Sequence, residues 1–364
     1  MKIQEITSII EELAPLAYQE SYDNAGLIVG NPNDEVKGVL ICLDSTEEIV
    51  DEAVSKGCDL IVAHHPIVFS GLKKLNGKNY IERTIIKAIK NNIAIYAAHT
   101  NLDNVTNGVS FTMAQKIGLI NCKVLAPKVN LLNKIVTFCP TRETEKVRQA
   151  MFDAGAGAIG EYGECSFNVE GTGTFKAGDN TTPYVGKKNE RHLEPEVRIE
   201  TVAVTHQVNK VVKALIQAHP YEEVAYDIYP LNNSVNTVGS GVIGELQQEE
   251  EEHTFLKRLK SDLKTDCIRH THLRNKKVKR VALCGGSGSF LLNDAIKANA
   301  DIFITGDFKY HQFFDAEGKI VIADVGHYES EQFINELFYE LLTEKITNFA
   351  VRLSEINTNP INYL

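Results

Sequence analysis

Two adjacent histidines follow an apolar run in the first part of the 364-residue sequence. His64 and His65 come directly after Leu60–Ala63, which has the length and composition of a buried strand. Successive side chains of a strand point to opposite faces, so the two imidazoles are better placed to reach two neighbouring cations than to chelate one. Pro66 ends the strand ladder and exposes both rings. We therefore interpret the pair as metal ligands rather than as core histidines.

A third histidine and two carboxylates lie near the ends of other expected strands. Asp103 follows the apolar run 93–98 by a few residues, where a carboxylate is able to bridge two cations. His327 and Glu331 are four residues apart, so a helix over 328–342 would place both on one face of its first turn. The predicted metal ligands are His64, His65, Asp103, His327 and Glu331.

This set of ligands indicates hydrolytic chemistry. Imidazoles and carboxylates suit zinc or iron, with manganese as the alternative. Five ligands do not close two structural sites, so a bridging carboxylate or bound water would complete the coordination of two divalent ions. Water between two cations is acidified to hydroxide, a nucleophile, at neutral pH. His311 is the candidate general acid or base, and His99 and Asp307 are candidates to orient ligands.

The glycine-rich segment 285–289 connects an expected strand to an expected helix. Its backbone amides could cradle a phosphate. The segment matches neither the dinucleotide-binding nor the Walker A pattern, and a tight structural turn is the alternative.

Alternating strands and helices position these residues. Apolar runs separated by amphipathic helices predict a largely parallel sheet covered by helices. The order strand, helix, strand in the first part of the sequence occurs again late in the chain at a fixed offset, which indicates an internal repeat. In this repeat Asp307 corresponds to His65. The strands of the first set are expected at 38–43, 60–63 and 93–98, and those of the second at 281–284, 302–305 and 319–323. Both sets place polar residues beyond the carboxyl ends of strands, where α/β sheets bind ligands.

The pattern changes in the middle of the sequence to shorter strands and two helices. Its two strand-helix pieces predict an inserted ferredoxin-like α+β domain. We therefore expect an α/β protein in which residues 1–129 and 237–364 are two similar halves of one domain, and residues 130–236 form the insert.

Composition excludes several classes of protein. The formal charge of −10 disfavours general nucleic-acid binding. No apolar run reaches the roughly 18 residues of a membrane helix, and the N-terminus lacks the layout of a signal peptide, so we expect a cytoplasmic protein without membrane contact. The seven cysteines are scattered and odd in number, which indicates reduced thiols.

Five motifs in the outer parts of the chain resemble those of the NIF-three-like dinuclear metal-centre family, often labelled GTP cyclohydrolase I type 2 homologues. They are YDNAGL at 22–27, AHHP at 63–66, HTNLD at 99–103, TGD with YH within 305–311, and GHYESE at 326–331. One departure is Tyr22, where the family commonly has tryptophan.

This resemblance implies that the same five residues bind the metal pair, with Glu331 rather than Glu329 beside His327. It also implies a toroidal homohexamer whose metal sites face an internal cavity. The middle segment, including the motif HPYEEVAYD at 219–227, resembles the inserted domain of longer members, akin to trimeric nitrogen-regulator and copper-tolerance proteins.

Three functions are compatible with these residues. The first is a metal-dependent hydrolase acting on a nucleotide or another small phosphorylated or ring-containing substrate, although no guanine-reading motif supports GTP itself. The second is a non-catalytic metal-handling or regulatory hexamer whose insert senses a small ligand. The third is an oligomeric scaffold in which metals add stability.

Overall fold

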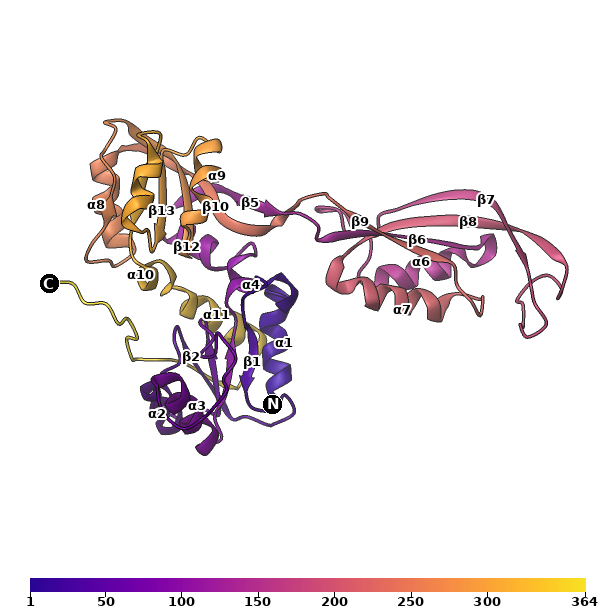
Figure 1. Cartoon of the computed structure of the whole chain (residues 1–364), viewed down its shortest axis with the longest axis horizontal. Coiled ribbons are helices and arrows are strands. Elements are labelled where there is room, and N and C mark those ends of the chain that lie inside the picture. The colour runs from indigo at the N-terminus through magenta and orange to yellow at the C-terminus, as the bar shows by residue number, and fades with distance from the viewer. The chain divides into compact units, whose positions relative to one another are not determined.

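A computed structural model describes all 364 residues. Contacts within the chain divide it into unit 1, which comprises Met1–Pro127 and Asn236–Leu364, and unit 2, which comprises Lys128–Val235. Unit 1 contains two sheets and unit 2 contains one (Figure 1). No helix has the length and apolar character needed to cross a membrane. The α/β class predicted from the sequence is confirmed.

The first sheet of unit 1 has four parallel strands and one antiparallel edge strand. Its order is β1 (Gly26–Val29), β4 (Ala94–Ala97), β3 (Leu60–Ala63), β2 (Gly38–Cys42) and β15 (Ala350–Leu353), with β1 antiparallel to β4. Alternate residues of β2 enter different cores, since Val39 and Ile41 pack with α1 (Ile3–Leu13) whereas Leu40 packs with α2 (Glu47–Ser55) and α3 (Tyr80–Lys90). Helices therefore cover both faces of this sheet.

The second sheet repeats the parallel centre of the first. Its order is β11 (Arg269–His270), β14 (Val321–Asp324), β13 (Ile302–Gly306), β12 (Lys277–Ser287), β10 (Val235–Glu251) and β5 (Leu119–Lys128). Strands β12, β13 and β14 are parallel, whereas β10 and β11 are antiparallel to their neighbours. Helix α8 (Glu252–Asp262) packs on one face, and α9 (Leu292–Lys297) packs on the other. The repeat inferred from the sequence thus corresponds to two sheets that each have a centre of parallel strands.

The two halves of unit 1 exchange their final elements. Helix α11 (Ile334–Lys345) buries Phe338 in the core of the first sheet, and β15 pairs with β2. Conversely, α5 (Val109–Lys116) buries Met113 in the core of the second sheet, which β5 also joins. Each sheet therefore depends on residues from both ends of the sequence.

One helix predicted from the sequence is divided in two. Instead of a continuous helix over 328–342, α10 (His327–Glu331) ends before α11 begins at Ile334. The chain changes cores at this point, because Phe333 is buried against the second sheet and Ile334 against the first. His327 and Glu331 remain within one turn, as the first and last residues of α10.

Unit 2 has the connectivity of a ferredoxin-like fold. Its elements are β6 (Leu132–Pro140), α6 (Thr144–Asp153), β7 (Ser166–Lys176), β8 (Arg191–Val204), α7 (Val208–Ala218) and β9 (Tyr226–Leu231). The antiparallel order is β7-β8-β6-β9, and both helices contribute to the core with Val147 and Leu215. The βαβ-βαβ arrangement inferred from the sequence is therefore correct.

Short helical turns complete the chain. They are η1 (Leu16–Tyr18), α4 (Thr100–Asp103), η2 (Thr141–Glu143), η3 (Thr205–Gln207), η4 (Ser289–Leu291) and η5 (Tyr310–Ala316).

Candidate metal centre

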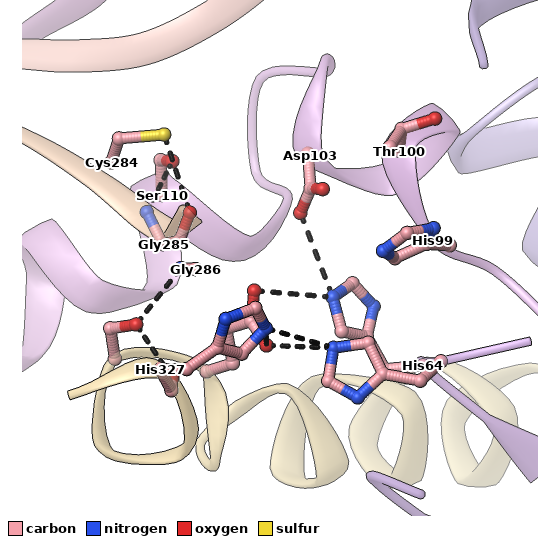
Figure 2. A network of polar contacts seen from close by, with 12 residues as sticks. His64, His99, Thr100, Asp103, Ser110, Cys284, Gly285, Gly286 and His327 are labelled. Carbon is pink, nitrogen blue, oxygen red and sulfur yellow. Dashed lines mark hydrogen bonds and ion pairs between the residues drawn. The ribbon is translucent and has the colours of Figure 1, made fainter. Parts of the chain in front are cut away.

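The structure gathers all five predicted ligands at the carboxyl ends of strands from both sheets of unit 1. His64 and His65 follow β3, and Asp103 ends α4, which begins shortly after β4. His327 and Glu331 lie on α10, which follows β14. Figure 2 shows Asp103, His64 and His327 pointing toward one another from these separate segments.

The ligand atoms form two groups that share one carboxylate. His64, Asp103 and Glu331 make the first group, and His65, His327 and Glu331 make the second, with ligand atoms in each within 4.8 Å of one another. Glu331 Oε1 lies 3.7 Å from His64 Nε2, whereas its Oε2 lies 3.0 Å from His65 Nε2 and 3.1 Å from His327 Nε2. Glu331 therefore belongs to both groups, whereas Asp103, for which the sequence suggested a bridging role, belongs to one.

Several polar atoms at the meeting point of these side chains lack a hydrogen bond. Nε2 of His64 and Oδ1 of Asp103 are buried without one, and the neighbours of the buried Glu331 Oε2 are the imidazoles of His65 and His327. Buried polar atoms in native proteins are almost always hydrogen-bonded, so such a convergence requires an explanation. Nε2 of His65 also lies only 3.3 Å from Nε2 of His327. A bound cation would satisfy these atoms together, and the donor set therefore fits a metal.

The opposite nitrogen of each imidazole has a partner that fixes the orientation of the ring. A carboxylate or carbonyl oxygen accepts a hydrogen bond from Nδ1, which directs Nε2 at the cluster, where its lone pair would be available to a cation once Nε2 carries no proton. The pairs are His64 with Ala98 O at 2.8 Å, His65 with Asp44 Oδ1 at 2.7 Å, and His327 with Asp307 Oδ2 at 2.7 Å. Asp307 thus orients a ligand, as the sequence suggested.

His99 lies closer to the ligands than an orienting residue requires. Its ring centre is 5.3 Å from that of His64 and 5.4 Å from that of His65, and the three rings could hold a metal ion together. Asp23 Oδ1 accepts a hydrogen bond from His99 Nδ1 at 2.7 Å, and the other Asp23 oxygen accepts bonds from Thr100. Burial raises the pKa of Asp23, but these hydrogen bonds have the larger combined effect and lower the pKa to about 2.

The electrostatics of the cluster are those of tightly coupled charges. Burial lowers the pKa of His64, which favours its neutral form. Burial also disfavours the charged forms of His65 and His327, but carboxylates outweigh it and raise the pKa of His65 to about 10 and that of His327 to about 11. Burial and the charge of Glu331 raise the pKa of Asp103, whereas the imidazoles hold the pKa of Glu331 low despite its burial. Cation binding would therefore displace protons from this site.

The glycine-rich segment after β12 supports Glu331, and the amides of its three glycines are already hydrogen-bonded within the chain. The amides of Gly285, Gly286 and Gly288 donate hydrogen bonds to the hydroxyls of Ser110, Ser330 and Thr305, respectively. Figure 2 shows the bonds of the first two glycines. Gly286 has φ +62°, and a Cβ there would lie 2.2 Å from Glu331 Oε1. The bonded glycine amides favour the structural turn over the phosphate cradle.

A cavity of about 850 Å³ opens onto the ligands. No lysine or arginine lines it, and its carboxylates are Glu20, Asp44, Asp103, Asp307 and Glu331. Aromatic rings form part of its wall. The ring centre of Phe69 lies 6.2 Å from that of Tyr22 and 5.9 Å from that of His99. The cavity is acidic and aromatic, and this lining favours a flat ring over a highly anionic ligand.

Sequence reasoning missed two features of this cavity. Asp44 follows β2 directly at the same sheet edge as the ligands, so the rule that identified Asp103 would also have found it. The C-terminal segment lines the cavity with Asn359, Pro360 and Ile361, and Thr358 donates a hydrogen bond to Asp44 at 2.6 Å. No periodic pattern or motif marks this segment.

His311 is not brought to the cluster. It lies exposed on η5, where its ring contacts those of Tyr310 and Phe314, and it does not line the cavity. The 3-10 turns of η5 direct it away from the strand edge. The structure of the chain therefore does not support the acid-base role that we assigned to His311.

Comparison with known proteins agrees with this architecture. A family model described as Duf34/NIF3 (NGG1p interacting factor 3) matches residues 1–360. The chain belongs to this family. It is 39% identical over 367 residues to the GTP cyclohydrolase 1 type 2 homolog of Halalkalibacterium halodurans, covering 99% of this chain and 98% of that one. It is also 38% identical to the homolog of Bacillus subtilis, with the same coverage of both chains.

Solved structures of family members share the whole fold. The Bacillus cereus protein related to NIF3 aligns with a TM-score of 0.86 at 40% identity, over 100% of this chain and 99% of that one. The Staphylococcus aureus protein SA1388 aligns with a TM-score of 0.80 at 30% identity and the same coverage. The family resemblance inferred from the motifs is confirmed, with a candidate metal site of histidine and acidic residues.

Proposed function

We propose that this NIF3-family protein is a metal-dependent hydrolase that binds two divalent cations per chain. The observation that carries the proposal is the convergence of buried ligand atoms on Glu331, where His64 Nε2 and Asp103 Oδ1 have no hydrogen-bond partner. Two ligand groups sharing Glu331 match two adjacent cation positions. Zinc or iron suits this mixture of imidazole and carboxylate, and manganese is the alternative.

The bound cations would acidify water and polarise the substrate. The protein's own contribution is to orient the imidazoles through Asp44 and Asp307, and to enclose the reacting atoms in a half-closed cavity. His99, held by Asp23, replaces His311 as the candidate for proton transfer, because its ring adjoins both His64 and His65.

The lining of the cavity favours one type of substrate. Tyr22 and Phe69 provide flat apolar surfaces for a ring. Five carboxylates line the cavity without a lysine or arginine, and the imidazoles of His65 and His327 would be occupied by the metal. The phosphates of a nucleoside triphosphate would therefore be balanced by the cations alone. We therefore propose a compact ring-containing substrate, such as a nucleoside or a small monophosphate, in preference to GTP.

Turnover measured on metal-loaded protein tests this proposal. The substrates would be nucleosides, nucleoside monophosphates and GTP, and the variants would be Asp103→Ala and His311→Ala. We expect Asp103→Ala to abolish turnover and His311→Ala, which removes an exposed imidazole outside the cluster, to retain it. Equal rates in Asp103→Ala and the parent protein would eliminate the hydrolase proposal.

A regulatory or metal-handling role is the second candidate, because unit 2 contains a cavity of its own. Binding of a small ligand to unit 2, together with an absence of metal-dependent turnover, would favour this role. For either function we propose self-assembly into the toroidal homohexamer that the family resemblance implies. Light scattering of the purified protein would give a mass of six chains, and a monomeric mass would contradict this assembly.

A further inference from the structure

Unit 2 contains a small cavity of about 290 Å³ to which we have so far assigned no role. It is formed by the end of β7, by β8, by the connection between these strands, and by the segment that follows α7. That last segment is part of the HPYEEVAYD motif at 219–227, which the metal centre does not use. The motif contributes Tyr221, Glu222, Glu223 and Ala225 to the lining.

Three aromatic rings surround this cavity. Phe175 comes from β7, Tyr184 from the β7–β8 connection, and Tyr221 from the motif. The ring centre of Tyr221 lies 5.9 Å from that of Phe175 and 6.2 Å from that of Tyr184. The planes are inclined at 61° and 57°, so the rings form an angled wall rather than a stack. The three rings therefore provide aromatic surface around a small space, and a cation is attracted to the electron-rich face of such a ring.

The charged groups that line the cavity are all carboxylates. Glu196 Oε1 accepts a hydrogen bond from the Tyr221 hydroxyl at 2.9 Å, which holds this carboxylate beside the ring. Glu222 accepts a bond from the amide of Thr182 at 2.8 Å, and Glu223 also lines the space. Gly173 allows the close approach of Glu196 to β7, because a Cβ at this position would lie 2.0 Å from Glu196 Oε2.

The basic groups near the cavity are outside its lining. The guanidinium of Arg142 lies 4.9 Å from the ring centre of Tyr184, and His192 is paired with Glu194 at 2.8 Å. Neither residue lines the cavity, and no lysine or arginine does. Arg142 shows that the ring of Tyr184 already attracts one cation from outside, while Glu196 has no cationic partner inside.

We propose that this cavity binds a small alkylated ammonium ion, such as a choline-like compound. Aromatic faces attract a cation whose charge is spread over methyl groups, and a carboxylate adds attraction at short range. The volume is at the lower end of the range for ligand cavities, so it suits a compact ligand rather than a nucleotide. Phosphate groups would be repelled by the carboxylates. The proposal is independent of the hydrolase function.

Calorimetry on the full-length protein tests this inference. The probes are choline, tetramethylammonium and the uncharged isostere of choline, in which carbon replaces the quaternary nitrogen. We expect both cations to bind once per chain, and the isostere to bind roughly tenfold more weakly, a difference of about 1.4 kcal/mol that lies within the range of cation–π attraction.

Four variants locate the binding. Tyr221→Ala and Glu196→Gln should each weaken choline binding by roughly tenfold or more. Tyr221→Phe keeps the ring and should retain binding to within about threefold, which separates the aromatic contribution from the hydroxyl. Asp103→Ala removes a carboxylate of the acidic metal cavity in unit 1 and should leave choline affinity unchanged. Circular dichroism would verify that Tyr221→Ala is folded.

Three results would overturn the proposal. The first is an absence of choline and tetramethylammonium binding at millimolar concentration. The second is equal affinity for choline and its uncharged isostere. The third is choline binding that Asp103→Ala weakens and Glu196→Gln leaves intact, since this would place the cation in unit 1.

Discussion

Replacement of Glu331 by glutamine should remove both bound cations at once. Glu331 is shared by both ligand groups, and each of its oxygens faces a different group. Glutamine has the same size but is uncharged, so the cavity keeps its shape while both cation positions lose their common anion. Glu329→Gln is a matched control, because Glu329 is equally buried on α10 but belongs to neither group.

The magnitude of the effect on stability has two parts. In the metal-free protein, His65 and His327 keep Asp44 and Asp307 as partners, so the loss should be about 1–3 kcal/mol rather than the roughly 3–5 kcal/mol of an uncompensated buried charge. In the metal-loaded protein, each site filled at 100 times its Kd contributes about 2.7 kcal/mol. Loss of both sites would therefore cost about 5 kcal/mol more, which lowers Tm by on the order of 10 °C.

Elemental analysis after dialysis, combined with urea unfolding in the presence and absence of a chelator, would measure both parts. We expect two metal ions per chain in the parent protein and in Glu329→Gln, and fewer than one in Glu331→Gln. The chelator should destabilise the first two proteins and leave the third unchanged. Retention of two ions in Glu331→Gln, or equal metal loss in both variants, would refute the shared position of Glu331.

Three further predictions concern Gly286 and Asp44 at the metal site and Glu52 on α2. Gly286→Ala should lower metal occupancy and destabilise the protein by roughly 1–3 kcal/mol, because φ is positive there and the new Cβ would displace Glu331, as metal analysis and urea unfolding would show. Asp44→Asn removes the acceptor for His65 Nδ1 and should weaken metal binding by roughly 10–100-fold in a chelator competition, whereas unchanged affinity would contradict the orienting role. Burial opposes ionisation of Glu52, but hydrogen bonds from Glu355, Ser354 and Lys56 lower its pKa below the ordinary value. The ionised Glu52 carboxylate should therefore stabilise the fold fully when the pH is above the ordinary pKa of a glutamate, and this stabilisation should be lost as the pH falls through the lowered pKa. In Glu52→Gln, the free energy of unfolding in urea should lose this dependence on acid pH.

The candidate metal ligands could be found from the sequence because the signals for them are local. Each apolar run has a short length and a turn at its end, so the place where its strand stops is visible in the sequence. The carboxyl ends of parallel strands meet at one edge, which brings His64, His65 and Asp103 together without any knowledge of long-range contacts. The repeat then identifies the corresponding edge of the second sheet, where His327 lies.

The exchange of elements between the two sheets could not be predicted in this way. The apolar faces of α5 and α11 would fit against either sheet, and β15 has no feature that selects β2 as its neighbour. Such choices depend on packing between residues far apart in the sequence, for which periodicity gives no signal. The role predicted for His311 does not fit the structure for a related reason. The direction of a side chain near a strand end depends on the turn that follows, and η5, which carries His311, is a 3-10 segment.

The division of the predicted helix at 332–333 is what allows one carboxylate to serve both ligand groups. A continuous helix would have to follow a single sheet, but Phe333 packs against the second sheet and Ile334 against the first. Glu331 therefore lies where the chain passes between the two cores, with His64 from the first sheet on one side and His327 from the second on the other. Cations bound there would connect segments of both sheets. Their removal should thus weaken the packing of α10 between the sheets more than it weakens either sheet alone.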